Sequence, residues 1–252
     1  MTVAPSPPDD AGIVENALLG GRVRLRQPAT GYRAGMDAAL LAAAVAAAPG
    51  QRVIEAGCGA GAVLMQIAAR RPGAVLTGLE RDPALTALAR ENAALNGAQA
   101  TILTGDVAAG FRELEVEPFD WAVSNPPFFD DPAALRAPSP GKRGAWMADD
   151  GLKAWTGFLL KAVREGGRIV VIHRADRLAD LLALLGEKAG SFAIRAVHPY
   201  TDEPAKRVVV QAIRTGRAPL RMLPPLVLHD RSGAKHTAEA EAILRGEAAL
   251  PF

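Results

Sequence analysis

The chain has 252 residues, 49% of them apolar, and a formal net charge of +2 at pH 7. This length and apolar fraction fit one large domain or a domain with an appendage, and they exclude a mostly disordered chain. The single cysteine, Cys58, excludes an intramolecular disulfide and a multi-cysteine metal site, and the four histidines lack the spacing of metal ligands. We therefore expect no metal ion.

The first 50 residues precede the repeating pattern of the chain. Residues 1–12 contain three prolines and two aspartates, without the basic and apolar regions of a secretory signal, so we expect a frayed tail. The longest apolar stretch, residues 38–48, is too short to cross a bilayer, so we expect a cytoplasmic protein without a membrane partner. Residues 13–50 are predicted to line the substrate and cofactor sites. Their clustered arginines permit a polyanionic partner and include Arg22, Arg24, Arg26 and Arg33.

From residue 52 onward, predicted strands and helices alternate. Strands are expected at residues 52–56, 74–80, 101–103, 121–123, 168–172, 192–197 and 207–213. Helices are expected at residues 63–70, 83–95, 152–163 and 176–188. This alternation is typical of a doubly wound α/β fold with a mostly parallel, seven-stranded sheet. The last two strands are joined only by residues 199–206, so we expect them to pair antiparallel.

Several residues are predicted to bound these helices. Asp82 is the expected N-cap of the helix at 83–95, with Pro83 in its first turn and Gly97 as its C-terminal stop. Gly166 and Gly167 are expected to end the helix at 152–163, and Asp176 to provide an acidic cap for the next one. Asp37 is either the N-cap of an alanine-rich helix or, together with Arg33, part of a cofactor pocket.

A glycine-rich segment, Glu55-Ala56-Gly57-Cys58-Gly59-Ala60-Gly61, links the first core strand to the first core helix. Glycines let the backbone turn tightly and approach a ligand closely, and ligands of open α/β sheets bind at the carboxyl ends of the strands. Gly57, Gly59 and Ala62 also fit the dinucleotide pattern G-x-G-x-x-G/A, so this segment alone leaves a nicotinamide cofactor open.

Two further acidic residues end neighbouring strands. Glu80 ends the second core strand, where a carboxylate can hold ribose hydroxyls. Asp106 follows the third strand, beside Val107, and can accept a hydrogen bond from an adenine amino group. Together with Glu55 and Gly61, these residues favour S-adenosylmethionine over a dinucleotide.

The sequence Asn125-Pro126-Pro127-Phe128 follows the apolar strand at 121–123. Two consecutive prolines cannot continue a strand, because neither has an N–H to donate. They form a rigid turn between an amide and an aromatic ring, which suits a planar group that carries an NH2. The Asn125 side-chain oxygen and the Pro126 carbonyl can accept the two N–H bonds, while Phe128 stacks on the plane. Positioning then carries catalysis, and no strong general base is required.

These motifs, in this order, resemble those of the class I methyltransferases that depend on S-adenosylmethionine. The resemblance covers residues 52 to about 214 and implies a Rossmann-like fold with S-adenosyl-L-methionine as cofactor. The Asn-Pro-Pro-Phe motif is similar to that of the branch that methylates exocyclic amines of adenine, guanine N2 or glutamine amides. The implied cofactor-binding residues are Glu55, Gly57, Gly59, Gly61, Glu80, Asp106, Val107 and Asn125, with Arg33 and Asp37; the implied catalytic residues are Asn125, Pro126, Pro127 and Phe128.

Segments outside the core are similar to the bacterial tRNA1(Val) adenine N6-methyltransferase family. They are residues 20–28, 31–41, 227–230 and 239–245. This resemblance implies that adenine N6 in tRNA is the target and tRNA the partner. Alternatives with the same chemistry are another RNA, DNA or a protein glutamine; alternatives of another class are an NAD-dependent oxidoreductase and a non-catalytic RNA-binding module. The expected domain plan is a tail (1–12), an N-terminal segment (13–50), a methyltransferase core (51–215) and a C-terminal tail packed on or near the core (216–252).

Overall fold

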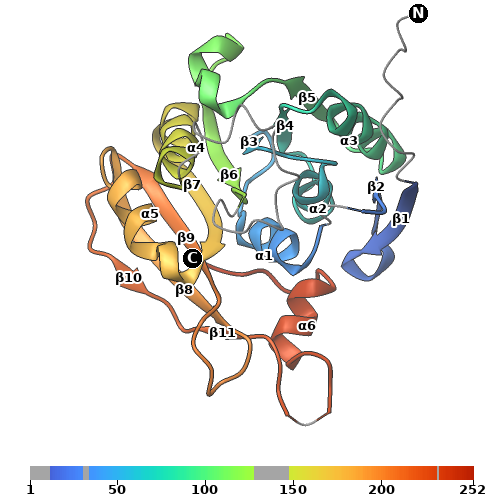
Figure 1. Ribbon diagram of the computed structural model, residues 1–252, viewed down its shortest axis with the longest axis vertical. Helices are drawn as coiled ribbons and strands as arrows, with labels where there is room; N and C mark the ends of the chain where they lie inside the picture. The colour runs from blue at the N-terminus through green and yellow to red at the C-terminus, as the bar shows by residue number, and fades with distance from the viewer. Residues whose placement is uncertain (1–11, 31–33, 128–147, 232) are drawn as a thin grey trace, which may run out of the picture.

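The computed structural model describes residues 12–30, 34–127, 148–231 and 233–252. Among these residues, a nine-stranded sheet forms the centre of the protein (Figure 1). Its strands are β3 (Arg52–Ala56), β4 (Val75–Glu80), β5 (Ala100–Thr104), β6 (Phe119–Ser124), β7 (Val163–Arg174), β8 (Ala189–His198), β9 (Arg207–Arg214), β10 (Arg221–Met222) and β11 (Leu226–Val227). Two further strands, β1 (Ile13–Leu18) and β2 (Val23–Pro28), form a separate antiparallel hairpin.

The sheet is mostly parallel, as predicted. The spatial order of the strands is β10-β8-β9-β7-β6-β3-β4-β5, and β11 pairs with the end of β8. Only β9 runs antiparallel, and it pairs with β7 on one side and β8 on the other. The short connection of residues 199–206 produces this reversal, because a parallel return would need a long crossover. The seven predicted strands are all present, and β10 and β11 extend the sheet beyond them.

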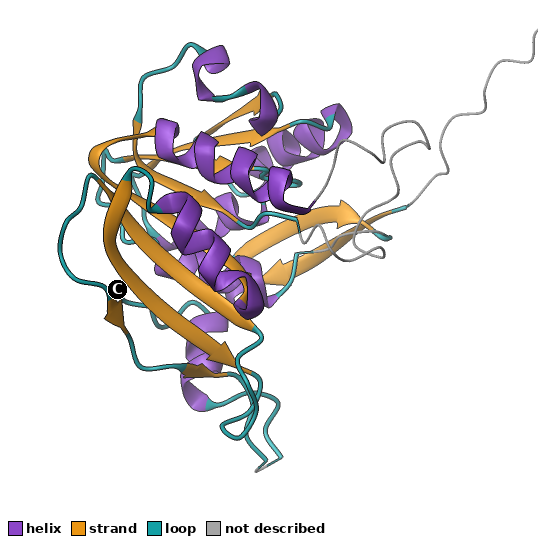
Figure 2. Cartoon of the chain, turned by 60° about the vertical axis from the view of Figure 1, so that its left-hand side comes forward, coloured by secondary structure: helices purple, strands orange, loops and turns teal. Residues whose placement is uncertain are grey.

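Helices cover both faces of the sheet (Figure 2). The chain has six α-helices among the described residues: α1 (Met36–Ala44), α2 (Ala62–Arg70), α3 (Pro83–Leu95), α4 (Ala148–Ala162), α5 (Leu178–Leu185) and α6 (Ala238–Leu244). Short 3-10 segments are η1 (Leu19–Gly21), η2 (Val107–Ala109), η3 (Phe111–Leu114) and η5 (Ala175–Arg177). Two hydrophobic clusters result, one with α1, α2 and α6 on one face and one with α4 and α5 on the other. Neighbouring strand residues such as Val53 and Ile54 divide between the two clusters, as side chains of a strand alternate between faces.

The two glycines predicted to end α4 lie elsewhere. The helix ends at Ala162, and Gly166 and Gly167 are part of β7. A Cβ at Gly167 would lie 3.0 Å from the Asp120 carbonyl oxygen of β6. Gly167 therefore permits a close approach of β6 and β7 beside the register shift between Phe119 and Trp121. In the sequence, a glycine pair with this role looks the same as a glycine pair that ends a helix.

The predicted acidic cap at Asp176 is also wrong. The α5 helix begins at Leu178, its N-cap residue is Arg177, and no side chain caps it. The Asp176 carboxylate instead pairs with the Arg174 guanidinium. An ion pair two residues away competes for the oxygens that a cap would use.

The C-terminal residues pack onto the sheet layers. The α6 helix contacts α1, and the Leu250 N–H donates to the Ala43 carbonyl oxygen at 3.0 Å. Three arginines hold the same region through backbone carbonyls. Arg22 donates to Gly246 at 2.7 Å, Arg70 donates to Ala248 at 2.8 Å, and Arg195 donates to Pro251 at 2.7 Å. Every helix among the described residues is too short or too polar to span a bilayer.

The predicted cap of α3 gives a test of this fold. The Asp82 carboxylate accepts the N–H of Ala84 at 2.8 Å, and Pro83 begins the helix. We expect Asp82→Ala to lower the free energy of unfolding by about 1 kcal/mol, because two orphan N–H groups lose their acceptor. Urea unfolding measures the change. Asp82→Asn is the control, since its amide oxygen can still cap; an equal loss in both variants would contradict the capping role.

Candidate functional site

The described site residues that were predicted at strand ends lie together at one edge of the sheet. Strands β3, β4, β5 and β6 run parallel in register, with Ala56 opposite both Leu79 and Ser124 and with Glu80 opposite Thr104. The carboxyl ends of these strands therefore meet at one edge. This edge carries the segment Glu55–Gly61, which we call the cofactor loop, together with Glu80, Asp106 and Asn125.

The cofactor loop depends on glycine geometry. Gly57, Gly59 and Gly61 have φ values of +70°, +53° and +86°, in the left-handed region that favours glycine. The N–H groups of Gly57 and Cys58 both donate to the Leu79 carbonyl oxygen, at 2.8 and 3.0 Å, which fastens the loop to β4. Gly61 is then the N-cap residue of α2, so the loop leads directly into a helix N-terminus.

Glu80 connects this loop to the start of α3. One carboxylate oxygen accepts the Gly59 N–H and the other accepts the Asp82 N–H, both at 2.9 Å. The side chain is buried, with 8% of the residue exposed. Each carboxylate oxygen has further lone pairs, so the anchored carboxylate can still accept from ligand hydroxyls.

Glu55 is more deeply buried than the other acids at this edge. Only 2% of the residue is exposed, and its Oε2 atom has no hydrogen-bond partner among the described residues. Burial raises the pKa of Glu55 well above its ordinary value; the nearby Glu80 charge raises it further, and a hydrogen bond from the Leu64 backbone lowers it. An unsatisfied buried carboxyl group favours a site that receives a hydrogen-bond donor or a cation.

Asp106 shapes the next strand end. Its Oδ1 atom accepts the Ala108 N–H at 2.9 Å and so caps η2, while Oδ2 lies 4.0 Å from the Arg81 guanidinium. Val107 is buried in the cluster that contains α4. Asp106 itself stays partly exposed at the edge, where a carboxylate can meet a ligand amine.

The Asn-Pro-Pro motif leaves β6 beside the cofactor loop. Ser124 is buried and its hydroxyl donates to the Ala56 carbonyl oxygen at 3.0 Å, which joins the last residue of β6 to the last residue of β3. Asn125 and Pro127 are half-buried, and Pro126 is buried. Phe128, the ring predicted to stack on the substrate, lies outside the described residues, as does Arg33.

One of the two roles predicted for Asp37, the N-cap of the alanine-rich helix, is wrong. Gly35 is the N-cap residue of α1, so Asp37 lies in the first turn of the helix rather than at its cap. Its carboxylate accepts from the Arg207 guanidinium at 2.9 Å, at the start of β9. This ion pair holds α1 at the edge where the strands end. A role of Asp37 toward the cofactor stays a prediction.

Trp155 is a site residue that the sequence did not indicate. A Cβ at Gly57 would lie 2.2 Å from Cη2 and 2.8 Å from Cζ3 of this half-buried indole, which belongs to α4. The ring therefore covers the first glycine of the cofactor loop. The sequence gives no local sign of this contact, because Gly57 and Trp155 are 98 positions apart and meet only through tertiary packing.

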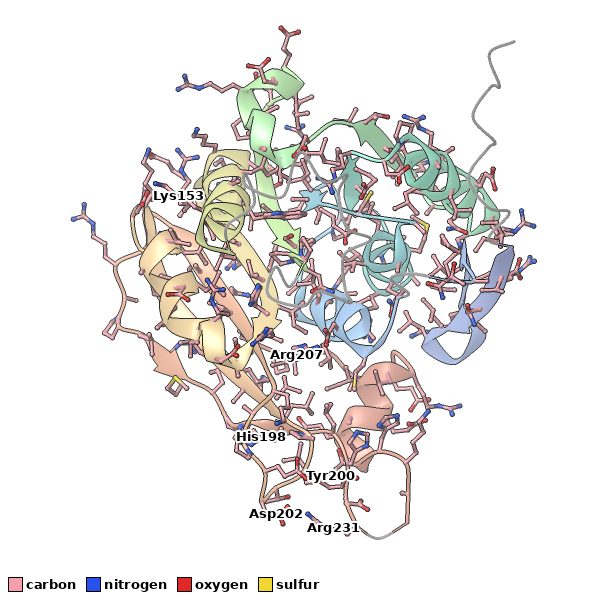
Figure 3. All side chains as sticks on the ribbon, in the orientation of Figure 1. Lys153, His198, Tyr200, Asp202, Arg207 and Arg231 are labelled. Carbon is pink, nitrogen blue, oxygen red and sulfur yellow. The ribbon has the colours of Figure 1, made fainter. Side chains whose placement is uncertain are left out.

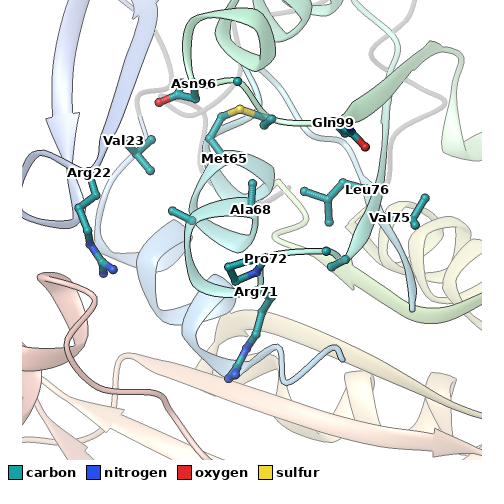
Figure 4. A pocket seen from close by; sticks show the side chains of 15 residues that line it. Arg22, Val23, Met65, Ala68, Arg71, Pro72, Val75, Leu76, Asn96 and Gln99 are labelled. Atoms are coloured by element: carbon teal, nitrogen blue, oxygen red, sulfur yellow. The ribbon is translucent and has the colours of Figure 1, made fainter. Parts of the chain in front are cut away.

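A cavity of about 560 Å³ lies at the opposite edge of the sheet (Figure 4). It is lined by the segment that enters β4, including Val75, by the turn before β5, including Gln99, and by the guanidinium-bearing Arg22 and Arg71. Because ligands of open α/β sheets bind at the carboxyl ends of the strands, we place the chemistry at the cofactor loop and not here.

Comparison with known proteins agrees with this geometry. A family model described as a methyltransferase small domain matches residues 33–137. A solved structure of a predicted O-methyltransferase from Agrobacterium tumefaciens superposes with a TM-score of 0.67 at 28% identity, covering 86% of this chain and 99% of that one. The chain is a class I S-adenosylmethionine-dependent methyltransferase. Its predicted cofactor, S-adenosyl-L-methionine, is confirmed at the level of this class, and the nicotinamide alternative is set aside.

Two curated relatives differ in what their names say they modify. A tRNA1(Val) (adenine(37)-N6)-methyltransferase from Porphyromonas gingivalis is 31% identical over 64% of this chain and 66% of its own length. A release factor glutamine methyltransferase from Deinococcus radiodurans is 40% identical over 34% of this chain and 29% of its own length. The chain thus spans about two thirds or less of these two relatives.

The residues at this edge of the sheet fit S-adenosylmethionine. Three glycines in left-handed conformation open the loop to a ligand, and acidic groups from three strand ends suit a molecule that carries hydroxyls, an adenine amine and two cationic groups. Glu55 adds a buried oxygen without a partner among the described residues. When bound, S-adenosylmethionine supplies an electrophilic methyl group on a sulfonium.

The contact between Gly57 and Trp155 predicts a non-additive pair of substitutions. Gly57→Ala should lower the free energy of unfolding by more than about 2 kcal/mol, because the cost of a positive φ and the cost of overlap between the new Cβ and the Trp155 ring add. Combined with Trp155→Ala, the cost should be at least about 1 kcal/mol below the sum of the two single changes. Urea unfolding measures all three.

Gly59→Ala is the matched control. Gly59 also has a positive φ, but a Cβ there meets no atom within 4 Å. The loss of unfolding free energy in Gly59→Ala should add to the loss in Trp155→Ala. Additivity for Gly57 as well would show that the ring does not restrict the loop.

Glu55 predicts a pH dependence of stability in the cofactor-free protein. Its pKa is raised in the folded state, so the folded protein holds this proton more tightly than the unfolded chain. The stabilisation is complete below the ordinary pKa near 4.5 and is lost as the pH rises toward the folded value. We expect Glu55→Gln to gain stability relative to the wild type between pH 5 and pH 8, measured by urea unfolding. A constant difference across this range would contradict a buried, proton-binding Glu55.

Proposed function

We propose that this methyltransferase transfers the methyl group of S-adenosylmethionine to an exocyclic amine, and that the amine is adenine N6 in tRNA. The observation that carries the proposal is the position of Asn125-Pro126-Pro127 at the exit of β6. Ser124, the residue before it, pairs with Ala56 of the cofactor loop. An amine held by Asn125 is therefore held beside the methyl donor.

The chemical task is to direct a weakly nucleophilic nitrogen. The lone pair of an aryl amine is delocalised into its ring, so the amine must be held with its lone pair aimed at the methyl group. The Asn125 side-chain oxygen and the Pro126 carbonyl accept the two N–H bonds in this proposal, and the proline pair keeps these acceptors fixed. The proton leaves after attack, when the nitrogen has become acidic, so positioning carries the rate.

An RNA substrate is supported by the loops beyond β8 and β11. Strand β8 runs parallel to β6 and β7, so residues 199–206 emerge at the edge where these strands end, and residues 228–231 and 233–237 follow β11 from the same end (Figure 3). The Tyr200 and His229 rings lie 5.5 Å apart, and the His229 and His236 rings stack at 5.1 Å. The Arg231 guanidinium lies 4.9 Å from the centre of the Tyr200 ring.

Flat rings beside a guanidinium suit unpaired bases, which RNA loops present. The sequence pI of about 8.9 also suits a polyanionic partner. A base within a folded nucleic acid must be flipped out or already unpaired to reach Asn125, and an anticodon loop meets this condition at low cost.

The direct test is methyl transfer from labelled S-adenosylmethionine to unmodified bulk tRNA, followed by digestion and mass spectrometry of the nucleosides. N6-methyladenosine is the expected product. Transfer to a release factor glutamine, with none to tRNA, would support the alternative that the Deinococcus radiodurans relative suggests. Binding of RNA without any transfer would support a non-catalytic module.

Asn125→Ala tests the proposed role of the amide. We expect kcat to fall by at least about 100-fold, because one of two positioned acceptors is lost, while the Kd for S-adenosylmethionine changes less than about threefold. Single-turnover kinetics and calorimetry measure the two quantities. Asn125→Asp is the control, since it keeps an acceptor oxygen and should lose less. An unchanged kcat in Asn125→Ala would exclude the assigned role.

A further inference from the structure

Asn92 joins three separate parts of the chain. It belongs to α3 and is fully buried, with 0% of the residue exposed. Its Oδ1 atom accepts the Arg26 N–H at 2.8 Å, and its Nδ2 group donates to the Arg26 carbonyl oxygen at 2.8 Å. The same Nδ2 group donates to the carbonyl oxygen of Ala60 at 2.9 Å. One side chain thus connects the β1–β2 hairpin to the cofactor loop.

Asn96, the C-cap residue of α3 and four positions beyond Asn92, provides a natural comparison. Its Oδ1 atom accepts the Arg24 N–H at 2.9 Å, and its Nδ2 group donates to the Arg24 carbonyl oxygen at 2.7 Å. Its other bond goes to the Asn92 carbonyl oxygen within α3. Asn96 therefore holds the hairpin in the same way as Asn92, without touching the cofactor loop.

The two asparagines pair with the outer edge of β2. Arg24 and Arg26 are two positions apart, so their N–H and C=O groups point to the same side of the strand, away from β1. Residues four apart on a helix share a face, so α3 presents its two amides with matching spacing. The hairpin consequently docks through backbone groups that would otherwise lack partners at a sheet edge.

A second buried side chain continues this connection. Gln27 is 4% exposed, its Nε2 donates to Asn16 Oδ1, and its Oε1 accepts the Ala34 N–H, both at 2.8 Å. The end of β2 is thereby fixed both to β1 and to the chain that enters α1. Asn92 then ties this assembly to Ala60, between Gly59 and Gly61.

We propose that the β1–β2 hairpin holds the cofactor loop in its binding conformation, and that Asn92 is the positioning residue through which it acts. The proposal rests on the assignment of residues 55–61 as the binding site of S-adenosylmethionine. The Ala60 carbonyl is held by Asn92 of α3, and the same amide is held by the Arg26 backbone, so a docked hairpin fixes the orientation of the amide that anchors the loop. The left-handed turns at Gly59 and Gly61 flank this anchor, and a glycine backbone has more conformational freedom than that of other residues.

Asn92→Ala and Asn96→Ala form the first test, with the full-length protein. We expect the Kd for S-adenosylmethionine, measured by calorimetry, to rise about tenfold in Asn92→Ala and less than about twofold in Asn96→Ala. In hydrogen-exchange mass spectrometry, peptides across residues 57–62 should exchange faster in Asn92→Ala only. A purely structural role would lower stability without this local and ligand-specific difference.

A second pair of variants leaves α3 intact. Arg26→Pro and Arg24→Pro each remove one arginine and one N–H bond to an asparagine, and neither N–H faces β1. We expect only Arg26→Pro to weaken cofactor binding. If Asn92→Ala fails to fold, these variants still test the positioning role of Asn92, because the N–H group that each of them removes lies in the hairpin and not in α3.

The outcomes separate the inference from its premise. If the wild type binds S-adenosylmethionine and both members of each pair lose affinity equally, the positioning role of Asn92 is overturned and the assigned site stands. If the wild type shows no binding at all, the assigned cofactor site is overturned and the inference with it. Selective loss in Asn92→Ala or Arg26→Pro, with faster exchange in the loop, supports the proposal.

Discussion

The register of three parallel strands is the constraint on which the site depends. β3 pairs with β4 and β6 so that Ala56 lies opposite Leu79 and Ser124, and the cofactor loop, Glu80 and Asn125 begin at the same level. A shift of one residue in β6 would exchange its two faces and turn Trp121 away from its cluster. The burial of both faces therefore fixes the distance between the proposed donor-binding motif and the proposed amine-binding motif. The hydrogen bond from Ser124 to Ala56 secures the same junction.

The acids at this edge make structural contacts in addition to the binding roles predicted for them. Glu80 is anchored by two backbone amides and Asp106 caps a short helix, so each has a defined orientation before any ligand is present. Preorganised acceptors bind a ligand at lower entropic cost than mobile ones. Glu55 is different, because burial raises its pKa and one oxygen lacks a partner among the described residues. Its burial is a cost to the cofactor-free fold that a donor or cation in the site would offset.

The arginines near the N-terminus make structural contacts that their clustering in the sequence did not predict. Arg22 donates to carbonyls at the end of α6, and Arg24 and Arg26 share the carboxylate of Glu15. The hairpin then presents less free positive charge than the sequence suggests. On the loops that follow β8 and β11, which lie in separate segments of the sequence, the Tyr200 and His229 rings lie together beside Arg231, and this guanidinium pairs with the Asp202 carboxylate.

The fold class, the order of the core elements, the α3 cap at Asp82 and the motifs at the strand ends all follow from the amino-acid sequence, because they depend on local periodicity and on residues with special backbone properties. Gly57, Gly59 and Gly61 and the proline pair are such residues. Three contacts become visible only in the folded chain: Trp155 covers Gly57, Asn92 connects the hairpin to Ala60, and Asp37 pairs with Arg207. Each of these contacts joins residues far apart in the chain, and an alanine-rich helix or a lone asparagine gives no local sign of its partner. The two-residue strands β10 and β11 follow the same rule, because pairing with β8, rather than any pattern of their own, makes them strands.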